Sequence, residues 1–140
     1  MKSRVDAEKL QKYVDASRQD FESKLGTLVE VPTVSMEPER RTDMQRGALI
    51  AAQYLRAFGA RSDVVPTGGH PLVHGHLDVG APRTITIYNH LDVQPASIDD
   101  GWEYEPFVFR NEDGRYEGRG TTDDKGPALS ALLGARYAIE

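Results

Sequence analysis

The chain has 140 residues, which is enough for one domain with one core and too few for two. A hydrophobic content of 39% with 28% charged residues is typical of a folded soluble protein. The net charge of −5, with scattered Lys and Arg, argues against nucleic acid as a partner, and the apolar runs are too short to cross a membrane. No cysteine is present, which excludes thiolate ligands, and with no apolar signal segment at the start we expect a cytoplasmic location.

Two amphipathic helices are predicted in the first part of the chain. Apolar residues recur at spacings of three and four from Ser3 to about Gly26, and again from about Glu39 to Phe58. Ser3 followed by Asp6 forms a weak capping box for the first helix. Pro32 interrupts the helical pattern between them.

Strands and a last helix follow. Alternating and β-branched residues indicate short strands at Arg61–Val65, Pro71–Val79, Arg83–Asn89 and Phe107–Arg110. The second and third are expected to pair as a hairpin across Gly80-Ala81-Pro82. A helix is predicted from Pro127 to Ile139. Because helices and strands intermix, we expect an α/β fold with a mixed sheet flanked by helices.

A histidine and a carboxylate stand where the third strand gives way to a loop. Asp92 is close enough to accept a hydrogen bond from one ring nitrogen of His90, which would leave the other nitrogen for a metal. The alternative interpretation is that His90 makes only an ordinary surface hydrogen bond. The motif alone does not decide, because His76-Leu77-Asp78-Val79 repeats the tetrapeptide His90-Leu91-Asp92-Val93. We favour His90 over His76 because the second copy leads into a long loop of the kind that carries sites.

Two adjacent carboxylates form the second candidate element. Asp123 and Asp124 stand between a glycine-containing turn and the last helix, whose N-terminus favours anions. Gly118 and Gly120 would let the backbone bend sharply toward the site. The alternative interpretation is that Asp123 or Asp124 only caps the helix.

Three motifs in this order, YNHLDVQPA, DGWEYEPF and GRYEGRGTTDDKGP, resemble the zinc exopeptidases. That family includes carnosine dipeptidases, aminoacylase, glutamate carboxypeptidase and succinyl-diaminopimelate desuccinylase. The match is close from about Thr84 to Gly134 and leans toward the dipeptidases. It implies that residues 1–140 are the incomplete N-terminal part of the catalytic domain, without its C-terminal part and without the lid domain. The consecutive Glu-Glu pair that supplies the general base in the family does not occur in this sequence.

The resemblance also implies roles for individual residues. His90 and Asp123 would bind metal, with Asp123 bridging two divalent ions, and Asp92 would act in catalysis as the partner of His90. Asp124, Gly118 and Gly120 would form the supporting loop, and the peptide bond between Asp123 and Asp124 is expected to be cis. The side chains of His90 and Asp123 should therefore converge to about 3–4 Å.

The expected chemistry is amide hydrolysis by a metal-activated water, with zinc as the first choice and manganese or cobalt as alternatives. The substrate would be a dipeptide or, alternatively, an N-acyl amino acid. This chain alone should be inactive, and it could form a homodimer. A different class of function stays open: a non-catalytic module that binds a protein and keeps the metal loop as a helix cap.

Overall fold

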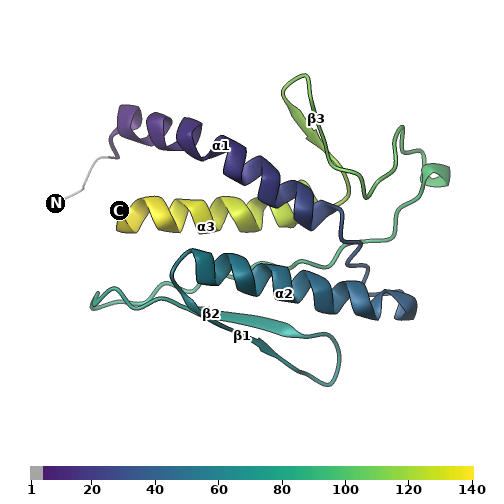
Figure 1. The fold of residues 1–140 in the computed structure, drawn as a ribbon, viewed down its shortest axis with the longest axis horizontal. Helices are drawn as coiled ribbons and strands as arrows, with labels where there is room; N and C mark the ends of the chain where they lie inside the picture. The colour runs from purple at the N-terminus through teal and green to yellow at the C-terminus, as the bar shows by residue number, and fades with distance from the viewer. Residues whose placement is uncertain (1–4) are drawn as a thin grey trace.

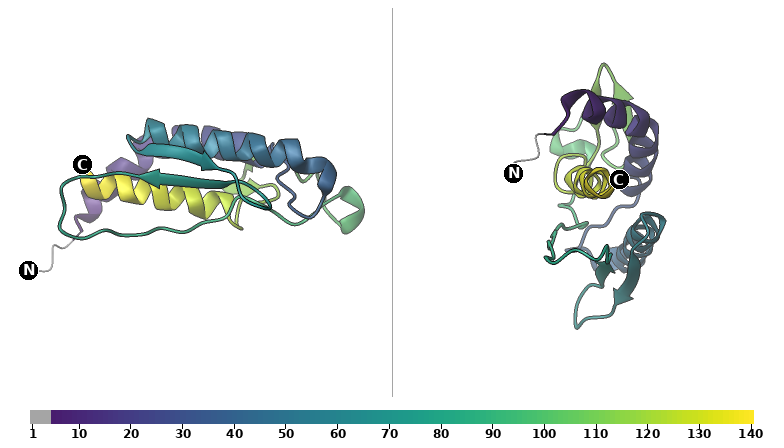
Figure 2. Two further views of the ribbon diagram at one scale, coloured as in Figure 1. Left: turned by 90° about the horizontal axis from the view of Figure 1, so that it is seen from below. Right: turned by 90° about the vertical axis from the view of Figure 1, so that its left-hand side faces the viewer.

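Three long helices form the body of the molecule (Figure 1). The computed structural model describes residues 5–140. Its long helices are α1 (Ala7–Val29), α2 (Arg41–Ala57) and α3 (Lys125–Ile139), and α3 lies between the other two (Figures 1 and 2). Two short 3-10 helices, η1 (Pro38–Arg40) and η2 (Ile98–Asp100), lie in the connections.

Helix α1 begins one residue after Asp6, whose carboxylate accepts hydrogen bonds from the backbone N–H groups of Glu8 and Lys9. An aspartate at this position satisfies donors that the first helical turn leaves unpaired. The predicted capping role of Ser3 lies outside the described residues. The helix runs past Gly26 to Val29, and Leu25, Gly26, Leu28 and Val29 near its end are buried.

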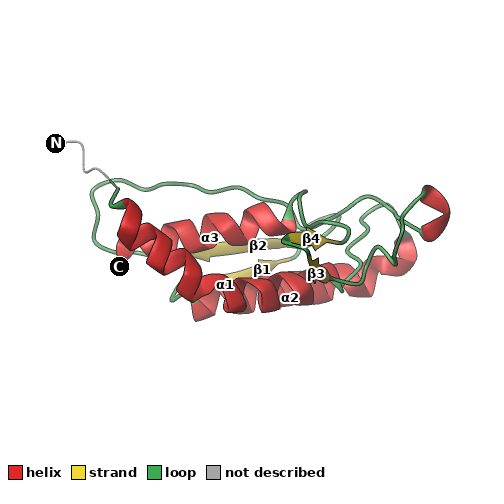
Figure 3. Ribbon diagram, turned by 90° about the horizontal axis from the view of Figure 1, so that it is seen from above, coloured by secondary structure: helices red, strands yellow, loops and turns green. Residues whose placement is uncertain are grey.

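The strands form two separate antiparallel hairpins (Figure 3). Strand β1 (Arg61–Val65) pairs with β2 (Leu72–His76), with Arg61 opposite His76. Strand β3 (Arg110–Glu112) pairs with β4 (Arg115–Glu117). Among residues 5–140, one isolated parallel bridge joins Val34 to Val93. The predicted α/β class is thus confirmed. In the described residues its strands form two two-stranded antiparallel sheets.

The predicted hairpin between Pro71–Val79 and Arg83–Asn89 is wrong. The turn at Pro66–Pro71 folds β2 back onto β1 instead, and residues 83–89 form no strand. Their alternating pattern is strand-like, but a strand needs a neighbour for its backbone groups, and residues 5–140 supply none at this position. The strand predicted at Phe107–Arg110 begins only at its last residue.

The core lies where α1 meets α3. Leu25, Leu28 and Val29 from α1 contact Leu129 from α3, and all four side chains are buried. Aromatic residues pack against this cluster. Among them are Phe109, directly before β3, and Tyr116, within β4. No described helix is long and apolar enough to cross a membrane.

A buried lysine joins the first turn of α3 to the end of α1. Lys125 is 1% exposed, and its ammonium group donates hydrogen bonds to the carbonyl oxygens of Leu28 at 2.8 Å and Val31 at 2.9 Å. Burial lowers the pKa of Lys125 to about 8. Each carbonyl oxygen also accepts a backbone hydrogen bond, Leu28 from the N–H of Val31 and Val31 from that of Thr33, so Lys125 adds a further donor at the end of α1.

We predict that Lys125→Met destabilises the fold. Methionine fills similar space but donates nothing, so each of the two carbonyl oxygens would lose its hydrogen bond from the ammonium group, at a total cost of about 2 kcal/mol or more. Urea unfolding followed by circular dichroism measures the change. Lys12→Met is the control, because Lys12 pairs with Glu8 on an exposed surface and should change stability by less than about 0.5 kcal/mol. Equal effects would contradict the role given to Lys125.

Two glycines of α3 provide a second, matched comparison. A Cβ atom on Gly126 would lie 2.0 Å from the backbone oxygen of Thr121, whereas one on Gly134 would meet nothing within 4 Å. We expect Gly126→Ala to cost about 1–3 kcal/mol through overpacking, and Gly134→Ala to stabilise the helix by up to about 1 kcal/mol. Thermal unfolding of both variants measures this, and a tolerated Gly126→Ala would mean that the loop before α3 is not held tightly.

Candidate metal centre

The two predicted metal ligands lie side by side although they are 33 positions apart in the sequence. His90 follows the long irregular connection after β2, and Asp123 precedes α3. The Nε2 atom of His90 and the Oδ1 atom of Asp123 are 3.0 Å apart. This is within the separation expected of two ligands of one cation, although their role as ligands remains a prediction.

Asp92 fixes the opposite side of the imidazole ring. The Nδ1 atom of His90 is 3.1 Å from the backbone oxygen of Asp92 and 3.4 Å from its Oδ1 atom. Ser35 donates a hydrogen bond of 2.7 Å to the other carboxylate oxygen of Asp92. This arrangement holds Nδ1 by hydrogen bonding and leaves Nε2 directed at Asp123.

Asp124 connects the two halves of the site. Its Oδ2 atom accepts hydrogen bonds from the side chain of Asn89 at 2.9 Å and from the backbone N–H of His90 at 3.2 Å. Asp124 occupies the N-cap position of α3 but makes no capping hydrogen bond with its side chain. The helix-cap interpretation therefore does not describe Asp124, whose carboxylate positions the histidine loop. The peptide bond between Asp123 and Asp124 is cis, as the resemblance implies.

The turn that precedes Asp123 depends on its glycines. Gly118 and Gly120 have φ angles of 143° and 96°, which side chains rarely tolerate. A Cβ atom on Gly120 would also lie 2.9 Å from the side chain of Lys125 and 3.1 Å from that of Val93. The backbone oxygen of Gly120 accepts a hydrogen bond from the N–H of Lys125. The supporting loop is thus packed directly against the start of α3.

Three residues of the site were not identified from the sequence. Ser35 and Thr33 come from the segment after α1, where Thr33 donates to the backbone oxygen of Leu91 and accepts from the N–H of Val93. Asn89, the third, adjoins the histidine motif. Its position directly before His90 was a usable signal, whereas nothing in the sequence linked residues 33–35 to a loop almost 60 positions away.

The first copy of the repeated tetrapeptide lies apart from this arrangement. His76 is the last residue of β2 and is exposed. Among the described residues it has no hydrogen bond or ion pair to a carboxylate. Of the two copies within the described residues, the one that contains His90 places its histidine beside Asp123.

The negative charges around His90 favour its protonated form. Burial lowers the pKa of the imidazole, but the hydrogen bond to the Asp92 carbonyl and the charges of Asp92, Asp123 and Asp124 raise it by more. The pKa of His90 therefore lies above the ordinary value of 6.5. Surroundings that stabilise an extra proton on this ring also stabilise a metal cation beside it.

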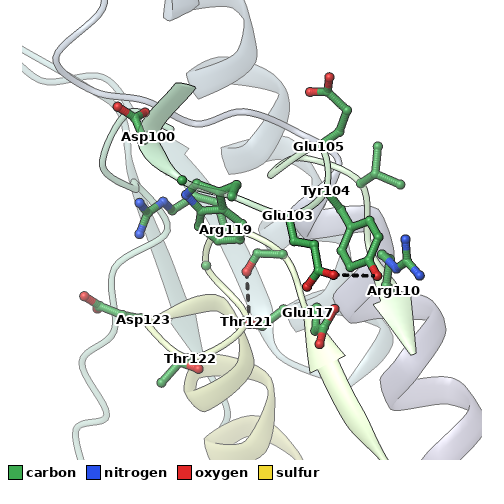
Figure 4. A pocket seen from close by; sticks show the side chains of 15 residues that line it. Asp100, Glu103, Tyr104, Glu105, Arg110, Glu117, Arg119, Thr121, Thr122 and Asp123 are labelled. Carbon is green, nitrogen blue, oxygen red and sulfur yellow. Dashed lines mark hydrogen bonds between the residues drawn. The ribbon is translucent and has the colours of Figure 1, made fainter. Parts of the chain in front are cut away.

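A hollow of about 500 Å³ adjoins Asp123 (Figure 4). Trp102 and Arg119 face each other on its wall, with the guanidinium carbon 5.1 Å from the centre of the indole ring. Glu103 and Glu117 also line it. The hollow has the size of a small-molecule site, and Figure 4 shows Asp123 at one side of it.

The donor set fits part of a metal site. One imidazole nitrogen and one carboxylate oxygen are suitable ligands for zinc and similar divalent ions. Asp123 retains most of its exposure, with 83% of the side chain accessible. Within residues 5–140, however, no group of three or more His, Asp or Glu side chains could hold a metal ion. These residues provide two candidate ligands, whereas a closed protein site usually has three or four.

Comparisons with known proteins agree with this geometry. Residues 86–139 match the model of peptidase family M20/M25/M40. The chain is 34% identical to the Cys-Gly metallodipeptidase dug1 of Schizosaccharomyces pombe, over 98% of the chain and 30% of that protein. It is also 34% identical to the β-Ala-His dipeptidase of Rattus norvegicus, over 88% of the chain and 28% of that protein.

Solved structures show the same relationship. The crystal structure of human carnosine dipeptidase 1 superimposes with a TM-score of 0.81 and 34% identity, over 94% of this chain and 31% of that one. The dipeptidase Dug1p of Saccharomyces cerevisiae gives a TM-score of 0.79 at 28% identity. The chain thus spans about 30% of the length of the relatives it matches. Sequence and fold together show that it belongs to peptidase family M20/M25/M40.

Proposed function

We propose that this chain is the N-terminal part of the catalytic domain of a metal-dependent dipeptidase and that it holds two ligands of the metal centre. The observation that carries the proposal is the 3.0 Å approach of His90 Nε2 to Asp123 Oδ1. His90 would bind one divalent ion, and Asp123 would bridge it to a second. Zinc is our first choice because both donors suit it, with manganese or cobalt as alternatives.

The other residues of the site would prepare these ligands. Asp92 and Ser35 fix the ring of His90 in the tautomer that presents Nε2. Asp124 holds the histidine loop against the start of α3 and so sets the separation of the two ligands. When bound, two divalent ions would polarise the amide carbonyl of the substrate and lower the pKa of a water molecule. Asp92 would thus act in catalysis through His90, as a positioning residue.

A dipeptide is the substrate class best supported. The relatives at 34% identity are named as dipeptidases for Cys-Gly and β-Ala-His, which favours a dipeptide over an N-acyl amino acid. The hollow beside Asp123 would accommodate part of such a substrate. Side chains of both charges line it, including Arg119 and Glu103, and a zwitterionic dipeptide carries both charges as well.

We propose further that residues 1–140 alone do not catalyse hydrolysis. They provide two ligands, and they lack the Glu-Glu pair that the resemblance assigns to the general base. A centre with two protein ligands binds its metal weakly, because few preformed donors compensate for the lost hydration of the ion. The activity would belong to a longer assembly that contains this part.

Zinc binding tests the assignment of the ligands. We expect the 140-residue chain to bind zinc weakly in isothermal titration calorimetry, and His90→Ala to reduce the affinity by about tenfold or more, since this substitution removes a ligand. His76→Ala is the matched control, because it alters the same tetrapeptide at a site away from Asp123. If both substitutions reduce zinc affinity equally, the wrong histidine has been chosen.

Activity tests the proposed function itself. We expect the isolated chain with zinc or manganese to cleave no Cys-Gly. A chimera in which residues 1–140 replace the matching part of the Schizosaccharomyces pombe Cys-Gly metallodipeptidase should cleave it when metal is present.

In that chimera, His90→Ala should reduce kcat by more than about a hundredfold, because losing even a residue that supports a ligand costs about 10–100-fold. His76→Ala should leave kcat nearly unchanged. Substantial turnover by the isolated chain, or an active chimera that carries His90→Ala, would refute the proposal.

A further inference from the structure

The wall of the hollow beside the candidate metal centre is built from two segments that meet at one arginine. Residues 95–106, which we call the wall loop, contribute one side, and residues 117–123, the turn before α3, contribute the other. Within residues 5–140, both hydrogen bonds that join the two segments involve Arg119. Its backbone N–H donates to the oxygen of Pro106 at 2.6 Å, and its guanidinium group donates to the oxygen of Pro95 at 3.5 Å.

The side chain of Arg119 is held by an aromatic ring rather than by a carboxylate. Its guanidinium carbon lies 5.1 Å from the centre of the Trp102 ring. Carboxylates line the same hollow, but within the described residues none of them forms an ion pair with Arg119. Its Nε atom is buried and has no hydrogen-bond partner in this part of the chain. A planar guanidinium group suits a position on an aromatic face, which an ammonium group does not reproduce.

The other contacts of the wall loop do not fix it to the turn before α3. Apart from η2 the loop is irregular, and the hydrogen bonds between Ser97 and Asp100 are internal to it. Arg110 stacks on Tyr104 at 3.5 Å, but this contact joins the loop to β3. The side chain of Arg119 therefore provides the side-chain link between the two segments of the wall.

We infer that Arg119 is a positioning residue, which fixes the wall loop on the turn before α3 and so sets the shape of the hollow. The inference rests on the proposed function, which makes this hollow the place of the substrate. The candidate metal ligands are held by other groups, since Asp124 and Asp92 position His90. Loss of the Arg119 side chain should thus weaken substrate binding and leave metal binding nearly unchanged.

The fluorescence of Trp102 tests this role without metal or substrate. Trp102 is the only tryptophan in the sequence, so the emission reports on this ring alone. In EDTA we expect Arg119→Gln to raise the acrylamide quenching constant at least about twofold, because the guanidinium group no longer covers one face of the ring. Arg115→Gln is the matched control, since Arg115 is exposed on β4 and does not line the hollow. Circular dichroism checks that both variants are folded, and an unchanged quenching constant in folded Arg119→Gln would overturn the inference.

Kinetics separate a positioning role from a direct charge contact with the substrate. In the chimera with the Schizosaccharomyces pombe enzyme, Arg119→Lys should raise KM for Cys-Gly about threefold or more while kcat changes less than about twofold. Trp102→Ala should act in the same way, and the double variant should be no worse than either single variant, because all three remove one contact. A KM that lysine leaves unchanged would show that Arg119 acts through its charge, contrary to the inference.

Zinc titration provides the last comparison. Arg119→Gln in the 140-residue chain should change zinc affinity by less than about twofold, well below the loss expected when a ligand or its supporting residue is removed. A loss as large as that of His90→Ala would place the effect of Arg119 at the metal centre and would contradict the inference. An inactive unsubstituted chimera would count against the proposed function alone, because the quenching experiment decides the role of Arg119 without activity.

Discussion

The structure depends on the pair of neighbouring residues at the start of α3. The carboxylate of Asp124 binds the histidine loop through Asn89 and the backbone of His90, and the ammonium of Lys125 binds the end of α1. Three parts of the chain thus meet at one point. Because both side chains are polar and at least partly withdrawn from water, each is stable there only if its partners are in place.

This junction explains how a folded core can position reactive side chains. The apolar contacts of Leu25, Leu28 and Val29 with Leu129 fix α3 against α1. The first turn of α3 then sets Asp123, and Asp124 draws His90 to within 3.0 Å of it. The core determines where the helices lie, while directional hydrogen bonds determine the orientation of the two candidate ligands. A shift of α3 along α1 would separate the two candidate ligands.

The candidate metal centre and residues 84–88 both lack partners among residues 5–140. No third candidate ligand joins His90 and Asp123 there, and the backbone groups of residues 84–88 form no hydrogen bonds with one another or with other segments. Membership of the M20 family gives a consistent reason, since the matched relatives are about three times as long. On the proposed function, His90 and Asp123 would be two ligands of a site whose other ligands come from outside residues 5–140.

Much of the local structure could be predicted from residue patterns. The spacing of apolar residues identified all three long helices, because helical periodicity is a property of the sequence itself. Motif order identified the family, and the loop after each tetrapeptide distinguished His90 from His76. Strand prediction was less successful: Arg83–Asn89 has the alternation of a strand, but pairing depends on a neighbour that sequence alternation does not specify.

What the sequence determined by itself was therefore the helices, the family and the two residues most suited to bind metal. Only the tertiary structure decided that β2 pairs with β1, that Asp124 supports the histidine loop rather than capping α3, and that Thr33 and Ser35 hold residues 91–93. The physical reason is the range of the interactions. Helix periodicity and motifs are local, whereas these contacts join residues between about 10 and 60 positions apart, and only the packed chain brings such residues within hydrogen-bonding distance.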